Sequence, residues 1–334
     1  MKTALLSFLL AFACSFVVTP LARKLAIKFN VLAQPSERRI HDRPMPLWGG
    51  IGIYVGFMIA VAVTVIVHSN LYPGQSQLRY DAILGTLLGG TIVAVVGIFD
   101  DKLDLKAIVQ FGAVLLGGAT LIACGTKIAF ISLPLIGGIN LHWWTVPLTL
   151  IWIFAVTKTV DLMDGLDGLA AGICAIASAT LLVMTFRELD PVWKLEHPKL
   201  VESFVTVRIM SSALLGASLA FLRYNYPPAK IFMGTIGAQF MGFVIASISI
   251  IGAFKIAALF AIAVPLLVLA VPIVDTAFVV TMRAIRGQRV YEADKSHVHH
   301  RLLERGLTRI QTIWVIYALT ASLSAAGLLV WFLK

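Results

Sequence analysis

The stretch TKTVDLMDGLDGLAAG (157–172) connects two long apolar runs, residues 143–160 and 169–186. Runs of roughly 18–22 apolar residues have the length that an α-helix needs to cross about 30 Å of hydrocarbon. The stretch contains one lysine and three aspartates at intervals of three: Lys158, Asp161, Asp164 and Asp167. The stretch therefore predicts two membrane-spanning helices joined by a short acidic segment at one membrane face.

The rest of the chain continues this pattern. Of its 334 residues, 59% are hydrophobic and 13% are charged, and the mean hydropathy is +0.91. A soluble domain carries far more charged residues, so the composition predicts an all-α polytopic membrane protein, with residues 1–334 forming a single domain. The first apolar run leads into RKLAIKF without a small-residue cleavage site, and we expect it to stay in the mature protein. We expect about ten transmembrane helices, at residues 3–22, 47–68, 81–99, 106–124, 143–160, 169–186, 204–222, 237–253, 257–282 and 311–333.

Basic residues are concentrated at one membrane face. By the positive-inside rule this face is cytoplasmic, and an even number of spans then places both termini outside. The net charge of +10 is accordingly explained as a signal for membrane orientation and does not by itself indicate nucleic-acid binding. Basic loops of this kind also attract anionic lipid headgroups and phosphorylated ligands. The three cysteines are scattered and are interpreted as small apolar residues. The connections that hold 18 of the 27 lysines and arginines are 23–46, 100–106, 157–168, 223–236 and 283–310.

Two adjacent carboxylates, Asp100 and Asp101, stand at the inner end of the third span. Like charges this close raise each other's pKa unless a cation neutralises them, and a divalent metal does so best. The alternative is a stop-transfer charge cluster, although such clusters usually consist of lysine and arginine. The pair therefore favours a metal or phosphate site.

The acidic segment allows two interpretations. If it is helical, Asp161, Asp164 and Asp167 share a face that drifts slowly around the axis, while Gly165 and Gly168 leave the opposing backbone open to a metal or nucleotide. Otherwise it is a short acidic loop with glycines for turning. Acidic residues that line a membrane-embedded pocket are usually functional.

The other loops on this face carry groups suited to phosphate. The segment RYNYPPAKIFMGTIGAQ (223–239) leads through a glycine-bearing turn into a span, and a helix N-terminus of this kind can bind an anion. Histidines and arginines in the first and last loops suit a diphosphate better than zinc, because no second cluster with zinc-ligand spacing accompanies them. The alternative for the arginines is a topogenic role. The candidate substrate-binding residues are Arg39, His41, Asn225, His297, His299, His300 and Arg301.

Together these loops predict one cytoplasmic face with carboxylates for Mg²⁺ and cations for phosphate, opening onto lipid. Phosphoryl transfer uses a metal that neutralises the phosphoryl oxygens, fixed cations and an acceptor held in line. A lipid acceptor would explain why such a site lies in a membrane.

The motifs resemble those of the polyprenyl-phosphate N-acetylhexosamine-1-phosphate transferases, over nearly the whole chain and in order. RRIHDRPMPLWGG resembles the first cytoplasmic motif of this family, GIFDD its paired-aspartate motif, DLMDGLDGLAAG its DG-x-DG-LA motif and YNYPPAKIFMG its N-x-x-P-A-x-x-FMG motif. VPIVDT also matches, and HVHHRLLERG is similar to the form used by the undecaprenyl-phosphate GlcNAc-1-phosphate transferase branch rather than the pentapeptide branch.

The resemblance implies that a polyprenyl phosphate attacks the β-phosphorus of a UDP-N-acetylhexosamine, most often UDP-GlcNAc, to give polyprenyl-diphospho-sugar and UMP. It further implies a Mg²⁺ requirement, a bacterial inner-membrane location and a role in cell-wall or other envelope glycan synthesis, and it leaves homodimerisation open. The implied catalytic residues are Asp100, Asp101, Asp164 and Asp167. The metal ligands expected for this chain are Asp101, Asp161 and Asp164.

Several positions depart from the family pattern. Thr235 stands where the family has an aspartate regarded as a Mg²⁺ ligand, Ala238 replaces a serine, and Lys158 and Asp161 replace two asparagines. One hypothesis is compensation, in which Asp161 supplies the carboxylate that Thr235 lacks while Lys158 offsets charge. A second is a catalytically silent paralogue that binds polyprenyl phosphate or nucleotide sugar. A third, from another class, is a secondary transporter, although the charges gather at span ends rather than at the midplane.

Overall fold

A computed structural model describes residues 1–34, 44–72, 78–133, 137–189, 198–252, 302 and 306–333. Most of these residues are helical, and two short antiparallel strand pairs lie between the helices. The helices are α1 (Lys2–Lys28), α2 (Gly50–Leu71), α3 (Tyr80–Leu103), α4 (Ala107–Ala123), α5 (Thr145–Met163), α6 (Leu169–Met184), α8 (Pro198–Asn225), α9 (Gly234–Gly252) and α13 (Arg309–Leu333). The remaining elements are β1 (Leu32–Ala33), β2 (Met45–Pro46), β3 (Phe130–Leu133), β4 (Gly137–Asn140) and the 3₁₀ turns η1 (His142–Trp144) and η2 (Thr185–Leu189).

The predicted spans coincide with these helices. In the described part of the chain, eight helices are long and apolar enough to cross a membrane, and α4 is a shorter apolar helix. The all-α polytopic membrane fold is thereby confirmed. The predicted span 257–282 lies outside the described residues. The helices α3 and α5 extend beyond the predicted ends at 99 and 160, because polar residues at the end of a span can continue a helix once they find partners.

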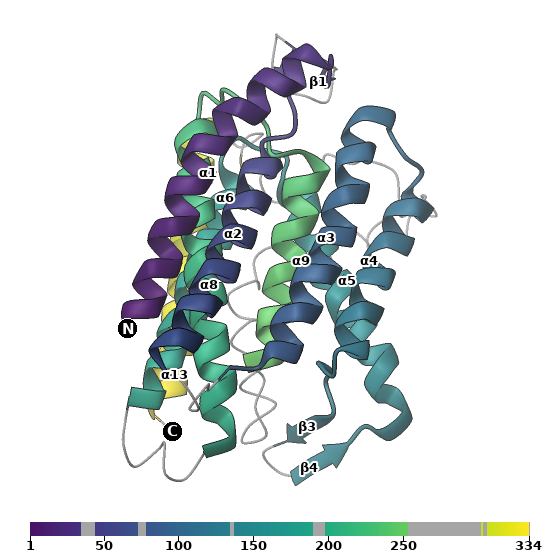
Figure 1. Ribbon diagram of the computed structural model, residues 1–334. Coiled ribbons are helices and arrows are strands. Elements are labelled where there is room, and N and C mark those ends of the chain that lie inside the picture. The colour runs from purple at the N-terminus through teal and green to yellow at the C-terminus, as the bar shows by residue number, and fades with distance from the viewer. Residues whose placement is uncertain are drawn as a thin grey trace.

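One helix forms the centre of the bundle. The span of α9 is 94% buried, whereas those of α1 and α13 are 28% and 33% buried. Helices α2, α3, α5, α6 and α8 all pack against α9 (Figure 1). Large apolar side chains remain exposed on the outer helices, as expected for surfaces that face lipid tails rather than water.

The first turns of α2 and α9 are in direct contact. A Cβ on Gly50 would lie 2.2 Å from the amide nitrogen of Gly237, so this crossing requires glycine. The backbone reinforces the contact, because the amides of Gly49 and Gly50 donate to the carbonyls of Phe232 and Met233 at 2.9 and 2.8 Å. The segment before α9 is thus fixed against the start of α2.

The two ends of the bundle differ. The strands β1 and β2 and the α3–α4 connection lie at one end of the bundle, and both chain termini lie toward the other end, which also carries β3 and β4 (Figure 1). The strands β3 and β4 form an antiparallel hairpin there, and Gly137 and Gly138 lie within β4. Which end faces the cytoplasm stays a prediction from the basic residues.

Candidate active site

Asp100 lies in the last turn of α3, where the helix stops. Its side chain is buried, and Oδ1 accepts hydrogen bonds from the Leu105 amide at 3.1 Å and from Nε2 of Gln110 at 2.7 Å. The helix ends because Asp104 adopts the left-handed conformation, with φ of 50°. The carboxylate therefore ties the end of α3 to the start of α4.

Asp101 lies against the N-terminus of α9. Its Oδ1 accepts a hydrogen bond from the Thr235 amide at 2.7 Å. Gly234 has φ of +71°, and a Cβ there would lie 2.2 Å from Oδ2 of Asp101. The glycine-bearing turn that the sequence offers as an anion site thus holds a carboxylate of the protein itself, because exposed amides and the helix dipole favour negative charge.

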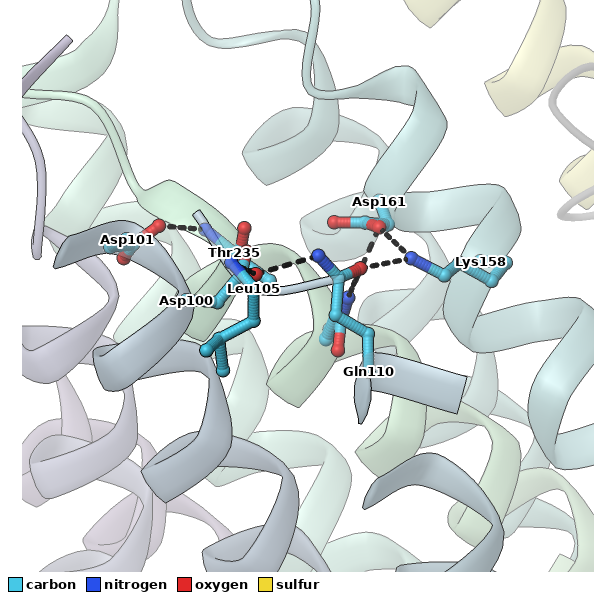
Figure 2. Close-up of polar contacts among 8 residues, drawn as sticks. Asp100, Asp101, Leu105, Gln110, Lys158, Asp161 and Thr235 are labelled. Atoms are coloured by element: carbon cyan, nitrogen blue, oxygen red, sulfur yellow. Dashed lines mark hydrogen bonds and ion pairs between the residues drawn. The ribbon is translucent and has the colours of Figure 1, made fainter. Parts of the chain in front are cut away.

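A polar network links this region to α5 (Figure 2). Nζ of Lys158 donates to Oδ2 of Asp161 and to Oε1 of Gln110, both at 2.7 Å. Nε2 of Gln239, a buried side chain of α9, donates to Oε1 of Gln110 at 3.0 Å and to Oδ2 of Asp161 at 3.2 Å. Helices α3, α4, α5 and α9 therefore meet through Asp100, Gln110, Lys158, Asp161 and Gln239.

The three aspartates of the acidic segment do not share one helix face. The helix α5 ends at Met163, and Asp164 is the residue that follows its last turn. Gly168, with φ of +77°, begins α6. The helical interpretation of the whole segment is wrong, because the chain turns sharply there through a conformation that favours glycine. The alternative of an acidic turn is the one observed.

The acidic turn is attached to the connection between α8 and α9. Oδ2 of Asp167 accepts from the Ala229 amide at 3.0 Å. Oδ1 of Asn225 accepts from the Gly168 amide at 2.8 Å, and its Nδ2 donates to the Ile231 carbonyl at 3.0 Å. Asp167 and Asn225 are both buried, so these polar contacts fix the positions of the turn and of the connection.

Sequence reasoning missed three residues of this region. Tyr317 of α13 donates its hydroxyl to the Gly168 carbonyl at 2.6 Å, and Gln110 and Gln239 hold the network together. Each is a polar residue within a predicted apolar span or at its end, and such residues often mark functional interiors. That signal could have identified the two glutamines.

Six of the predicted substrate-binding residues lie outside the described residues, and their roles stay predictions. They are Arg39, His41, His297, His299, His300 and Arg301. The same holds for the VPIVDT motif.

Two carboxylate oxygens, Oδ2 of Asp101 and Oδ2 of Asp161, show how a divalent ion could fit this cluster. Oδ2 of Asp101 is buried and has no hydrogen-bond partner in the described chain, so it is an acceptor that a cation could satisfy. Oδ2 of Asp161 already accepts from an ammonium and an amide, which a metal would have to displace. In the part of the chain that the structure describes, no three His, Cys, Asp or Glu residues form a group that could hold a metal ion. Oδ2 of Asp101 is thus open to a cation, whereas Oδ2 of Asp161 is already occupied by two nitrogen donors.

Comparison with known proteins identifies the family. A family model described as glycosyl transferase family 4 matches residues 83–253. A relative named "Probable undecaprenyl-phosphate N-acetylglucosaminyl 1-phosphate transferase" from Bacillus subtilis (strain 168) is 36% identical over 93% of this chain and 80% of its own length. The chain belongs to glycosyl transferase family 4.

Other relatives match the chain at lower identity. The "Decaprenyl-phosphate N-acetylglucosaminephosphotransferase" of Mycolicibacterium smegmatis is 30% identical over 91% of this chain and 76% of its own length. A "Phospho-N-acetylmuramoyl-pentapeptide-transferase" of Clostridium botulinum (strain Eklund 17B / Type B) is 29% identical over 97% of this chain and 95% of its own length. The predicted family is confirmed, and the identities agree with the expected nearness to the GlcNAc branch.

The departures from the family pattern lie together in this family 4 chain. Lys158 and Asp161 contact each other, and Gln239, one turn after Thr235 on α9, bonds to Asp161. The Thr235 amide meanwhile bonds to Asp101. Lys158 and Asp161 therefore contact the same first part of α9 that carries Thr235.

Proposed function

We propose that this chain transfers N-acetylhexosamine-1-phosphate, with GlcNAc-1-phosphate as the expected group, from a UDP-sugar to a polyprenyl phosphate in the bacterial inner membrane. An oxygen of the lipid phosphate forms a bond to the β-phosphorus of the UDP-sugar, and the bond from that phosphorus to the bridging oxygen breaks, which releases UMP. The product, a polyprenyl-diphospho-sugar, would begin the synthesis of an envelope glycan. Residues 1–334 would act as one domain.

One observation carries this proposal. Carboxylates from segments far apart in the sequence gather at one end of a membrane bundle, around the N-terminus of α9. Membership of family 4 and the names of the relatives supply the reaction class. The lipid acceptor would reach this end from the bilayer, and the nucleotide sugar would arrive from the water phase.

The chain's own residues would hold and orient the reactants. Asp100 is held by Leu105 and Gln110, and it would orient the lipid phosphate together with Asp101. Asp167 and Asn225 fix the turn that would meet the nucleotide. These roles remain proposals, as do the substrate contacts of the arginines and histidines outside the described residues.

We propose Mg²⁺ as the cofactor, held by Asp101 and Asp164. The unpartnered Oδ2 of Asp101 supports this residue as one of the ligands, and Asp164 follows from the resemblance alone. When bound, such an ion would neutralise negative charge on the diphosphate.

The experiment incubates the purified protein with undecaprenyl phosphate and UDP-GlcNAc, with and without Mg²⁺, and measures UMP and the lipid product. We expect UMP only when both substrates and Mg²⁺ are present. The absence of UMP with every UDP-N-acetylhexosamine, alongside measurable ligand binding, would contradict the proposal.

A silent paralogue is the second candidate, and Thr235 favours it because a metal-ligand carboxylate of the family pattern is missing there. Losing such a ligand can cost several kcal/mol of transition-state stabilisation. The Thr235→Asp variant distinguishes the two candidates, since it would create activity only in a silent protein that kept the rest of its site. The transporter alternative gains nothing from the relatives, which are all named as transferases.

A further inference from the structure

Lys158 lies in a partly buried position, where an ammonium group without an anionic partner would destabilise the fold. It stands near the C-terminal end of α5, with its side chain 24% exposed, and the side chain of Asp161 one turn later is 18% exposed. Residues three apart on a helix lie on the same face, so the two side chains meet within α5 itself. A partly buried ion pair persists when additional hydrogen bonds satisfy its remaining donors and acceptors.

Those additional hydrogen bonds are present, and they connect the ion pair to Asp100 through Gln110. Oε1 of Gln110 accepts from both Lys158 and Gln239, so the Nε2 of Gln110 is directed to Asp100 at 2.7 Å. Oδ2 of Asp161 accepts from Lys158 and Gln239. The ammonium thus contacts one carboxylate directly and reaches a second through a single amide.

The donors around Asp161 oppose a metal there. A divalent ion of the Mg²⁺ type takes oxygen ligands, whereas the two groups on Oδ2 of Asp161 are nitrogen donors, one of them a cation. The charge that Asp161 adds to the neighbouring Asp100 and Asp101 is already balanced by Lys158. Compensation at this site therefore concerns charge and not metal coordination.

We propose that the Lys158 ammonium is the resident cation of this carboxylate cluster. It neutralises Asp161 and, through Gln110, holds Asp100 in place, so that Asp161 is a partner of Lys158 and not a metal ligand. Lys158 is in this sense a positioning residue. The proposal concerns charge and cation binding only, so it holds whether or not the chain transfers a sugar phosphate.

The test measures cation binding and thermal unfolding of the full-length protein in detergent, with Mn²⁺ as the probe read by electron paramagnetic resonance. The variants are Lys158→Met, Asp161→Asn and the double variant, and Lys106→Met is the control because Lys106 is an exposed lysine in the neighbouring α3–α4 connection. Unfolding is recorded in EDTA and in Mn²⁺.

We expect Lys158→Met to melt at a lower temperature than the wild type in EDTA, because Asp161 and Asp100 lose their cation. Added Mn²⁺ should recover much of this loss, and Mn²⁺ should bind roughly tenfold more tightly than to the wild type, which corresponds to about 1.4 kcal/mol. The double variant should regain stability in EDTA and lose the extra Mn²⁺ affinity. Asp161→Asn leaves the Lys158 charge unbalanced and should weaken Mn²⁺ binding, whereas Lys106→Met should leave it as in the wild type.

Weaker Mn²⁺ binding in the double variant than in the wild type would overturn the proposal, because that variant keeps the net charge of the cluster and Asp161 would then be a metal ligand in the native protein. Unchanged melting and binding in Lys158→Met would overturn it as well. If Lys158→Met does not fold but the double variant does, the expected charge effect is present in its strongest form. If neither folds, the pair acts through packing and the proposal fails.

Discussion

Asp101 and Gly234 show how closely single residues are fitted in this region. The carboxylate of Asp101 covers the first turn of α9, accepts the Thr235 amide, and lies where a side chain at position 234 would have to go. A carboxylate at a helix N-terminus typically contributes about 0.3–1 kcal/mol, and more when partly buried. The contact therefore couples the end of α3 to the start of α9.

Gly234→Ala tests this contact. A methyl group there would meet Oδ2 of Asp101 at 2.2 Å, and the backbone at φ of +71° costs an L-residue about 1–2 kcal/mol. We expect a lower melting temperature and at least roughly a tenfold loss of transfer activity, which corresponds to about 1.4 kcal/mol.

Gly112→Ala on α4 is the matched control, because nothing lies within 4 Å of its Cβ position. It should leave activity unchanged and keep or raise stability, since alanine is favoured over glycine in helices. A Gly234→Ala protein that matches the wild type in both measurements would show that Asp101 can move without consequence.

At this scale the sequence predicted the reactive groups but not their partners. The adjacent carboxylates of Asp100 and Asp101 indicate a functional site because two like charges repel each other unless a cation or hydrogen-bond donors stabilise them. Their contacts with Gln110 and Thr235 depend on how α4 and α9 pack, and hydropathy carries no information about that packing.

Among the elements, α13 has the least obvious connection to the site. It packs on α6, and its Tyr317 hydroxyl reaches the Gly168 carbonyl in the acidic turn. A Cβ on Gly172 would lie 1.9 Å from the same hydroxyl oxygen, so the two helices are in close contact there. Nε1 of Trp314 also donates to the Tyr226 hydroxyl at 3.2 Å. The last helix thus supports the turn that holds Asp167.

Tyr317→Phe should loosen this support. The variant loses one buried hydrogen bond, with a net cost of about 1 kcal/mol, and leaves the Gly168 carbonyl without that donor. We expect a modestly lower melting temperature and a several-fold loss of transfer activity, because the turn bearing Asp167 becomes less fixed. Thermal unfolding and UMP release measure the two effects.

Tyr54→Phe provides the comparison, because its hydroxyl bonds to Oγ1 of Thr91 between α2 and α3 at 3.1 Å. It should lower stability by a similar amount without reducing UMP release. Equal activity in the two variants would show that α13 does not support the site.

Helix boundaries at the site were harder to predict than the helices themselves. The length and apolar character of a span follow from the thickness of the bilayer, so the spans could be placed from composition alone. The end of α5 at Met163 depends instead on a turn whose Gly168 has φ of +77°, and spacing in threes gave the wrong impression of a continuous helix.

For the whole molecule, the orientation in the membrane is the main prediction still to be tested. Single cysteines introduced at Lys28 and Trp143, both exposed and near opposite ends of the bundle, report the two faces after the native cysteines are replaced. We expect a membrane-impermeant thiol reagent to label position 143 in intact cells and position 28 only after the membrane is opened, because the basic loops face the cytoplasm.

The reverse labelling pattern would place the carboxylate cluster outside the cell, away from any supply of nucleotide sugar. Labelling of both positions in intact cells would indicate damaged membranes, which a cytoplasmic marker protein with a reactive thiol detects.

The central position of α9 has a consequence for how such proteins diverge. A helix enclosed by five others cannot shift sideways when one of its side chains is replaced, so the change must be answered on the helices that touch it. Lys158, Asp161 and Thr235 should accordingly be inherited as a set. Lineages that regain an acidic residue at 235 should carry neutral residues at 158 and 161, and mixed combinations should be rare among living descendants.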